Sequence, residues 1–249
     1  MRSKGLKSFA ILCICAINGF AQRPRSTSIF SIAIDGVVAQ LVDGGSWKTI
    51  ITLVNLDTTV TTYTINFYSD SGTPMSLQTT GGSGASITGT IPIGGSRVIE
   101  TLGTNLLLSQ GWARVSTSNK ASGEAIFRQS VAGRPDFEAS MPIIVYVEGN
   151  DYILPFDNAT SSTGVAILNP LSSGITVFAT FRDQNGNKFL VDSFTMNPLQ
   201  HMAFSLATQY PQSAGQIGTV EFSTSGIAMD ILGLRFGVQS FTSIIPLTP

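Results

Sequence analysis

The side chains that could carry out catalysis are few in this chain, and they are scattered. Histidine occurs once, at His201, so a Ser-His-Asp triad would have to use that residue. His201 lies in NPLQHMAFS, which predicts a solvent-exposed turn entering a strand, and no G-x-S-x-G motif accompanies it. One histidine also supplies too few ligands for a histidine-based zinc site. We therefore expect no catalytic residue, no metal and no cofactor.

Paired carboxylates are the remaining route to an enzyme, because glycoside hydrolysis uses two of them. Asp43 and Asp157 stand out, since each follows a strand-like segment and precedes a Gly or Asn. We expect both to be turn aspartates that accept backbone N–H bonds. Calcium ligation through their oxygens is the alternative, although no D-x-D-x-D-G run supports it. The other candidate carboxylates are Glu124, Glu138, Glu221 and Asp230.

The stretch GWARVSTSNKASGEAIFR, residues 111–128, collects charged residues in a chain that is only 12% charged. Apolar and polar residues alternate on either side of a Ser-rich centre, which predicts a β-hairpin. Arg114 and Glu124 would then lie on the solvent face and pair across the strands. The residues predicted to face the core are Ala113, Val115, Ala125 and Phe127.

Two tryptophans, Trp112 and Trp47, are the candidate ligand-facing residues. Each could stack on a sugar ring, and Tyr68 and Tyr152 could extend such an aromatic row. The alternative is that each tryptophan caps one end of a hydrophobic core.

The N-terminal segment MRSKGLKSFAILCICAINGFAQ has the pattern of a secretory signal peptide. Three basic residues precede a short apolar run, which holds both cysteines, and small residues precede a cleavage point after Ala21. The run is shorter than the roughly 20 residues that a membrane-spanning helix needs. We expect a signal peptide over 1–21 and a flexible leader over 22–28. Cleavage would leave 11 Lys and Arg against 15 Asp and Glu, a net charge of −4, and no cysteine.

The composition favours short strands joined by many turns. The 249 residues are 43% hydrophobic and include 25 glycines and 11 prolines, which suit turns rather than long helices. The formal net charge of −1 offers no attraction to nucleic acid or to an anionic membrane.

Matches between two parts of the sequence indicate an internal duplication. AQLVDGGSWKTIITLVN (39–55) aligns without a gap on ILPFDNATSSTGVAILN (153–169), which matches two turn-forming asparagines, Asn55 and Asn169. Further on, the 111–128 stretch aligns with GTVEFSTSGIAMDILGLR (218–235), so that Arg128 meets Arg235. Order and nearly constant spacing predict two similar domains, over 29–145 and 146–249.

Within each copy, apolar residues recur with a period of two, and Gly-, Ser- and Asp-rich turns separate these segments. The pattern predicts an all-β chain of two tandem antiparallel β-sandwiches, each with seven or eight strands. NLLLSQ (105–110) and SLATQYP (205–211) each predict a short helical turn.

The chain resembles an immunoglobulin-like β-sandwich module of exported, mostly uncharacterised bacterial proteins, in which the module often occurs in tandem. The resemblance lies in LVDGGSWKTIITLVNLDTT, INFYSDSGTP, IPIGGSR and GWARVSTSNKASGEAIFR, and it extends from about residue 37 to 247. The second copy is more divergent and lacks the GGS and GW motifs. The resemblance implies a fold and an exported setting, and it assigns no catalytic residue.

We therefore expect a secreted, periplasmic or cell-surface protein without enzymatic activity, in a structural or adhesive role. Its partners would be proteins or polysaccharides at the cell surface, bound through loops or a sheet edge. The alternative is a carbohydrate-binding or accessory module of an extracellular system. We expect no nucleic-acid partner, and no membrane span once the signal peptide has been cleaved.

Overall fold

The computed structural model describes residues 33–145, 151–225, 229–238 and 240–249, which belong to one compact unit. The predicted signal peptide and leader lie outside these residues. The described chain is all-β, and its strands pair antiparallel, as predicted. No helix among the described residues has the length and apolar character needed to cross a membrane. We call residues 33–145 the first half and the described residues from 151 onwards the second half.

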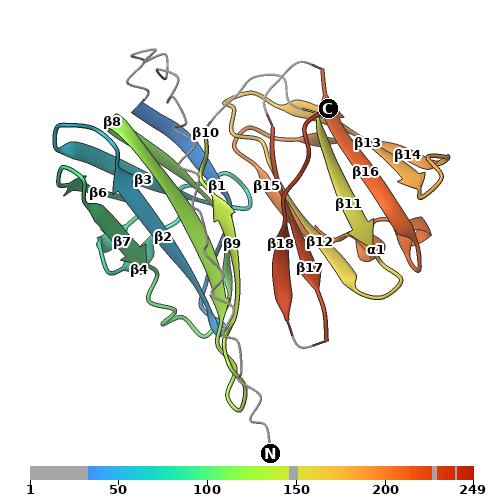
Figure 1. The fold of residues 1–249 in the computed structure, drawn as a ribbon, viewed down its shortest axis with the longest axis horizontal. Helices are drawn as coiled ribbons and strands as arrows, with labels where there is room; N and C mark the ends of the chain where they lie inside the picture. Colours follow the sequence, from blue (N-terminus) through green and yellow to red (C-terminus); the bar gives the residue numbers. More distant parts are fainter. Residues whose placement is uncertain (1–32, 146–150, 226–228, 239) are drawn as a thin grey trace, which may run out of the picture. The chain divides into compact units, whose positions relative to one another are not determined.

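The first half is built around one long strand, β8, which joins two layers (Figure 1). Residues 109–120 of β8 pair with β1 and β3, and residues 121–129 pair with β2 and β9. One layer therefore has the order β10-β1-β8-β3-β6, and the other has the order β7-β2-β8-β9. The strands are β1 (Ala33–Asp43), β2 (Trp47–Asn55), β3 (Thr61–Ser69), β4 (Leu77–Thr79), β5 (Gly82–Gly84), β6 (Ser86–Ile91), β7 (Ser96–Glu100), β8 (Ser109–Gln129), β9 (Phe137–Pro142) and β10 (Ile144–Val145).

The predicted hairpin at 111–128 was wrong, because this segment is the single strand β8. Its polar centre does not reverse the chain. Instead, the strand leaves its partners in one layer and gains new partners in the other. Arg114 and Glu124 consequently do not face each other, and Arg114 donates to the Pro170 carbonyl. The predicted core-facing residues are all buried, namely Ala113, Val115, Ala125 and Phe127.

The second half contains two four-stranded sheets, which share one apolar core (Figure 1). One sheet has the order β11-β16-β13-β14, and the other has the order β15-β12-β17-β18. The elements are β11 (Tyr152–Asp157), β12 (Ser162–Leu168), β13 (Ile175–Asp183), β14 (Lys188–Met196), β15 (His201–Ser205), α1 (Leu206–Gln209), η1 (Pro211–Ser213), β16 (Ile217–Thr224), β17 (Asp230–Phe236) and β18 (Phe241–Ile244).

The loop that precedes β8 in the first half packs differently from the loop that precedes β16 in the second half. The predicted helical turn at 205–211 is confirmed by α1 and η1, and Leu206 and Tyr210 of this loop are buried in the second core. The predicted turn at 105–110 was wrong, since that segment is irregular until β8 begins. Its leucines stay largely outside the core, with Leu106 and Leu107 exposed by 96% and 82%.

The strand order of the first half recurs in the second. The series β1-β8-β3-β6 corresponds to β11-β16-β13-β14, and β7-β2-β8-β9 corresponds to β15-β12-β17-β18. The register corrects one detail of the sequence alignment. Thr49 faces Phe127, whereas its counterpart Thr163 faces Arg235, so Arg235 occupies the position of Phe127 rather than that of Arg128. A slip of one residue places a side chain on the opposite face of the sheet.

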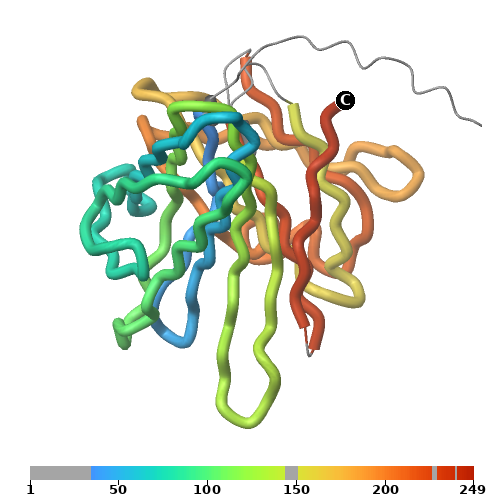
Figure 2. The backbone as a smooth tube through the Cα atoms, turned by 60° about the vertical axis from the view of Figure 1, so that its left-hand side comes forward, coloured from blue at the N-terminus to red at the C-terminus, as the bar shows by residue number. Residues whose placement is uncertain are grey.

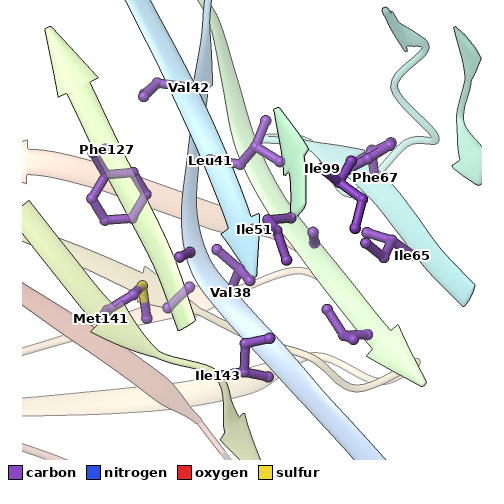
Figure 3. Close-up of a cluster of buried hydrophobic side chains, with 14 of the residues drawn as sticks. Val38, Leu41, Val42, Ile51, Ile65, Phe67, Ile99, Phe127, Met141 and Ile143 are labelled. Atoms are coloured by element: carbon purple, nitrogen blue, oxygen red, sulfur yellow. The ribbon is translucent and has the colours of Figure 1, made fainter. Parts of the chain in front are cut away.

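The core of the first half lies between its two layers (Figure 3). Its buried first-half members are aliphatic apart from Met141 and the aromatic residues Phe67, Phe127 and Tyr63, and residues of the second half continue it. These second-half members are Ala166, Leu232 and Phe241. The second half has a separate core between its own sheets, so only one of the two cores extends into the other half.

Candidate functional site: the face between the halves

In the sheet β15-β12-β17-β18, the two middle strands β12 and β17 are buried on both faces over most of their length. On β12, Val165 and Ile167 point into the second core. Ala166 and Leu168 point the other way and pack against residues of the first half. Strand β1 contacts β12 and β17, and β9 lies beside β18 (Figures 1 and 2). The sheet therefore serves as a wall that the two halves share.

Trp112 lies at one part of this shared face and is completely buried. Its ring stacks on Tyr68, with ring centroids 4.4 Å apart and planes inclined by 16°. Its indole Nε1 donates to the Leu199 carbonyl of the second half at 2.9 Å. Val37 and Leu168 complete this small cluster. A buried indole needs such an acceptor, and here the acceptor comes from the opposite half.

His201 lies next to this cluster, and the prediction that it would be solvent-exposed was wrong. It is 1% exposed, because the start of β15 packs against the turn that follows β3. Its Nδ1 lies 2.8 Å from Asp70 Oδ1, and its backbone N–H donates to the Asp70 carbonyl at 3.0 Å. Nε2 is buried and has no hydrogen-bond partner. His201 thus ties the two halves together, and within the described part of the chain no nucleophile is hydrogen-bonded to its ring.

Two further contacts join the two halves near this cluster. Arg114 Nη2 donates to the Pro170 carbonyl at 2.6 Å. At Gly72, where φ is +80°, an added Cβ would lie 2.8 Å from the carbonyl oxygens of Pro198 and Leu199. The backbones of the two halves therefore approach too closely at this point to admit a side chain.

Farther along the face, the halves separate and leave a cavity of about 290 Å³. The first half contributes residues of β1, β2 and β8, and the second half contributes residues of β12, β15 and β17. Trp47 forms part of the lining and packs against Phe241, with ring centroids 5.4 Å apart. The lining is predominantly apolar, and one of its polar members is the amide of Gln40.

Asp157 is a turn aspartate, as predicted, whereas Asp43 accepts a backbone N–H from a loop far away in the sequence instead of from its own turn. Asp43 is buried, and its Oδ1 accepts a 2.8 Å hydrogen bond from Gly103 N–H. Asp157 accepts from the backbone N–H groups of residues 159 and 160, and Arg235 Nη2 lies 2.8 Å from its Oδ2. The hydrogen bond from the Thr160 hydroxyl is the main cause that lowers the pKa of the Asp157 carboxyl. Both carboxylates therefore hold loops in place.

The other candidate carboxylates do not converge. Glu138 pairs with Arg128 at 2.6 Å, and Glu221 pairs with Arg182 at 3.1 Å. Asp230 is buried beneath Tyr152, whose hydroxyl donates to it at 3.3 Å, and burial raises its pKa to about 7. Across the described part of the chain, no three His, Cys, Asp or Glu residues gather as a metal site would require.

The four candidate aromatic residues do not form an exposed row. Trp112 and Tyr152 are buried, and Trp47 and Tyr68 are half-buried. Trp112 and Tyr68 belong to one cluster, whereas Trp47 lies at the cavity and Tyr152 lies in the second core. The position of Trp112 agrees with the alternative of a tryptophan that packs in the interior. The ligand-facing role of Trp47 and Trp112 stays a prediction.

The shared face was missed by the sequence reasoning, although the sequence carries a signal for it. In β12 the segment GVAIL is apolar at every position, while a sheet with one solvent face shows alternation. The same holds for ILGL in β17, since Leu232 and Leu234 lie on the face opposite Ile231. Such runs indicate a strand that is buried on both faces.

Comparison with family models, with curated proteins and with solved structures finds no match to this chain.

Proposed function

We propose that the protein is an exported, non-catalytic pair of immunoglobulin-like β-sandwiches, produced by duplication, with a structural or adhesive role at the cell surface. In this proposal, residues 1–21 are a signal peptide, and residues 29–145 and 146–249 are the two sandwich domains. The observation that carries it is the recurrence of one strand order in both halves. A shared, doubly buried sheet between the halves supports a stiff rather than a hinged pair.

Strands β13 and β14 are the surface that best suits a protein partner. Phe178, Phe189 and Val191 are 44%, 37% and 63% exposed, and β14 is the outermost strand of its sheet. An outermost strand presents unpaired backbone groups to which a partner strand can add. The first half has Thr64 at the position of Phe178, so this apolar character belongs to the second half alone.

Export is tested by expressing the full chain in a bacterial host and measuring the mass of the released protein. The proposal predicts cleavage after Ala21. A protein that keeps its N-terminal residues in the cytoplasm would contradict the exported setting.

The adhesive role is tested by the binding of labelled protein to intact cells of the organism that makes it. We expect saturable binding that is lost when Phe178 and Val191 are both changed to Thr. A matched control changes Val98 and Leu56, which are 54% and 51% exposed in the first half, and should bind normally. Absence of cell binding, or an equal loss in the control, would contradict the role of β13 and β14.

A further inference from the structure

We propose that the cavity between the halves is a binding site for a small, uncharged, apolar molecule that carries one hydroxyl group. The site lies apart from β13 and β14, so it is independent of the surface interaction proposed above. Residues of both halves form the lining, so a bound molecule would contact both at once.

The amide of Gln40 supplies the first reason. Gln40 is 6% exposed and lies in the cavity lining, and its Oε1 has no hydrogen-bond partner. A buried amide oxygen without a partner costs about 1–3 kcal/mol, so such a group is retained where something pairs with it. Because Oε1 has almost no accessible surface, a ligand hydroxyl would pair with the Gln40 amide by accepting from its N–H groups, or by donating to Oε1 after the side chain rotates.

The backbone at Gln40 supplies the second reason. The register between β1 and β8 shifts between Val38 and Leu41, which marks a β-bulge at this point. Bulges redirect side chains and are common beside functional sites. In the second half, β11 pairs with β16 without any shift, and the single residue Pro155 stands where the first half has the two bulged residues Ala39 and Gln40. The irregular backbone and the polar side chain therefore occur together at the cavity, and the equivalent pair of strands in the second half has neither.

The remaining lining determines the class of ligand. None of the described lining residues carries a charge, so a carboxylate or an ammonium group would be buried without a counter-ion. Most contacts come from apolar side chains, among them Val42, Phe127 and Leu234. Leu108 also lines the cavity and is itself 49% exposed.

The volume determines the size of the ligand. At about 290 Å³, the cavity is roughly twice the ~150 Å³ of an apolar cavity that holds benzene. A molecule with two fused aromatic rings, or with an alkyl chain of about ten carbons, fits this space. Trp47 in the lining provides a fluorescence reporter for binding.

The test compares 2-naphthol with naphthalene, which differ only in the hydroxyl group, by calorimetry and by tryptophan fluorescence of the purified protein. We expect saturable 1:1 binding of 2-naphthol and weaker binding of naphthalene. Gln40→Leu should lower the affinity for 2-naphthol by about five- to tenfold and change the affinity for naphthalene by less than about twofold. Ala203→Trp, at an exposed lining residue of β15, should abolish the binding of both compounds.

Thermal unfolding of each variant checks that it is folded, and Gln40→Leu should unfold no earlier than the parent protein. The proposal is overturned if neither compound binds saturably, or if Ala203→Trp leaves binding unchanged. An equal effect of Gln40→Leu on both compounds would overturn the role of the amide.

Discussion

The two halves of the molecule share a strand plan but differ in the outer face of one sheet. Thr52 and Glu124 face each other on β2 and β8 of the first half, at the positions that Ala166 and Leu232 occupy on β12 and β17. Thr52 is half-buried and Glu124 is exposed, whereas Ala166 and Leu232 are buried against the first half. The two halves thus have the same strand order and the same kind of core. A few residues on the outer face of one sheet decide whether that face contacts solvent or the other half.

Other features are the same in both halves and mark what the shared plan requires. Asn55 donates to the Thr59 and Ile91 carbonyls, and Asn169 donates to the Ser173 and Asn197 carbonyls. Both asparagines are buried at the end of the equivalent strand. Side chains that hold loops in place are therefore common to both halves, and side chains that join the halves are not.

The largest effect is expected at the joining cluster. Trp112→Ala should lower the free energy of unfolding by about 4 kcal/mol, because it leaves a large cavity and an unpaired Leu199 carbonyl. Trp112→Phe keeps most of the volume and should cost about 1–2 kcal/mol. Urea denaturation measures both variants. Losses below about 1 kcal/mol for Trp112→Ala would show that this cluster does not stabilise the pair.

A matched pair of glycines tests the shared plan. An added Cβ at Gly111 would overlap the Tyr68 carbonyl oxygen, and one at Gly218 would overlap the Arg182 carbonyl oxygen. Gly111→Ala and Gly218→Ala should each cost about 3 kcal/mol. Gly174→Ala is the control, since its nearest neighbour would lie 3.3 Å away. Denaturation curves in which only one of the two glycines is sensitive would contradict the equivalence.

The matched asparagines should show a smaller but similar loss. Asn55→Ala and Asn169→Ala each leave buried carbonyl groups without a donor, and we expect about 2 kcal/mol for each. Thermal melting of the two variants at the same pH gives the comparison. Changes that differ by more than about 1.5 kcal/mol would mean that the two loops depend on their asparagines unequally.

The stability of the second half should depend on pH through Asp230, whereas the first half has the non-titrating Ser122 at the equivalent position. The folded-state pKa is about 7 and the ordinary value is 3.8, so between these values the folded state binds more protons than the unfolded state. Stability should therefore fall as the pH rises from about 4 to 7. Asp230→Asn should raise the free energy of unfolding at pH 8 and leave it unchanged at pH 4. Unfolding midpoints at both pH values test this, and a variant that is equally stabilised at both would contradict it.

Much of the architecture could be predicted from the sequence, because period-two apolar patterns determine which face of a strand is buried. The turn aspartate Asp157 and the core residues of β8 follow from local patterns in the same way. The burial of His201 and the contact of Trp112 with the second half could not be predicted, since they depend on segments far apart in the chain. The predicted hairpin was wrong for a related reason. A polar centre is compatible with a strand that crosses from one sheet to the other as well as with a turn.

The central claim is that the shared sheet holds the two halves as one cooperative body. Scanning calorimetry tests it on the parent protein and on a variant that carries Ala166→Thr and Leu232→Glu, which gives β12 and β17 the outer residues of the first half. We predict one two-state transition for the parent and two separate transitions for the variant. Two independent transitions in the parent, or a variant that melts as the parent does, would contradict the claim.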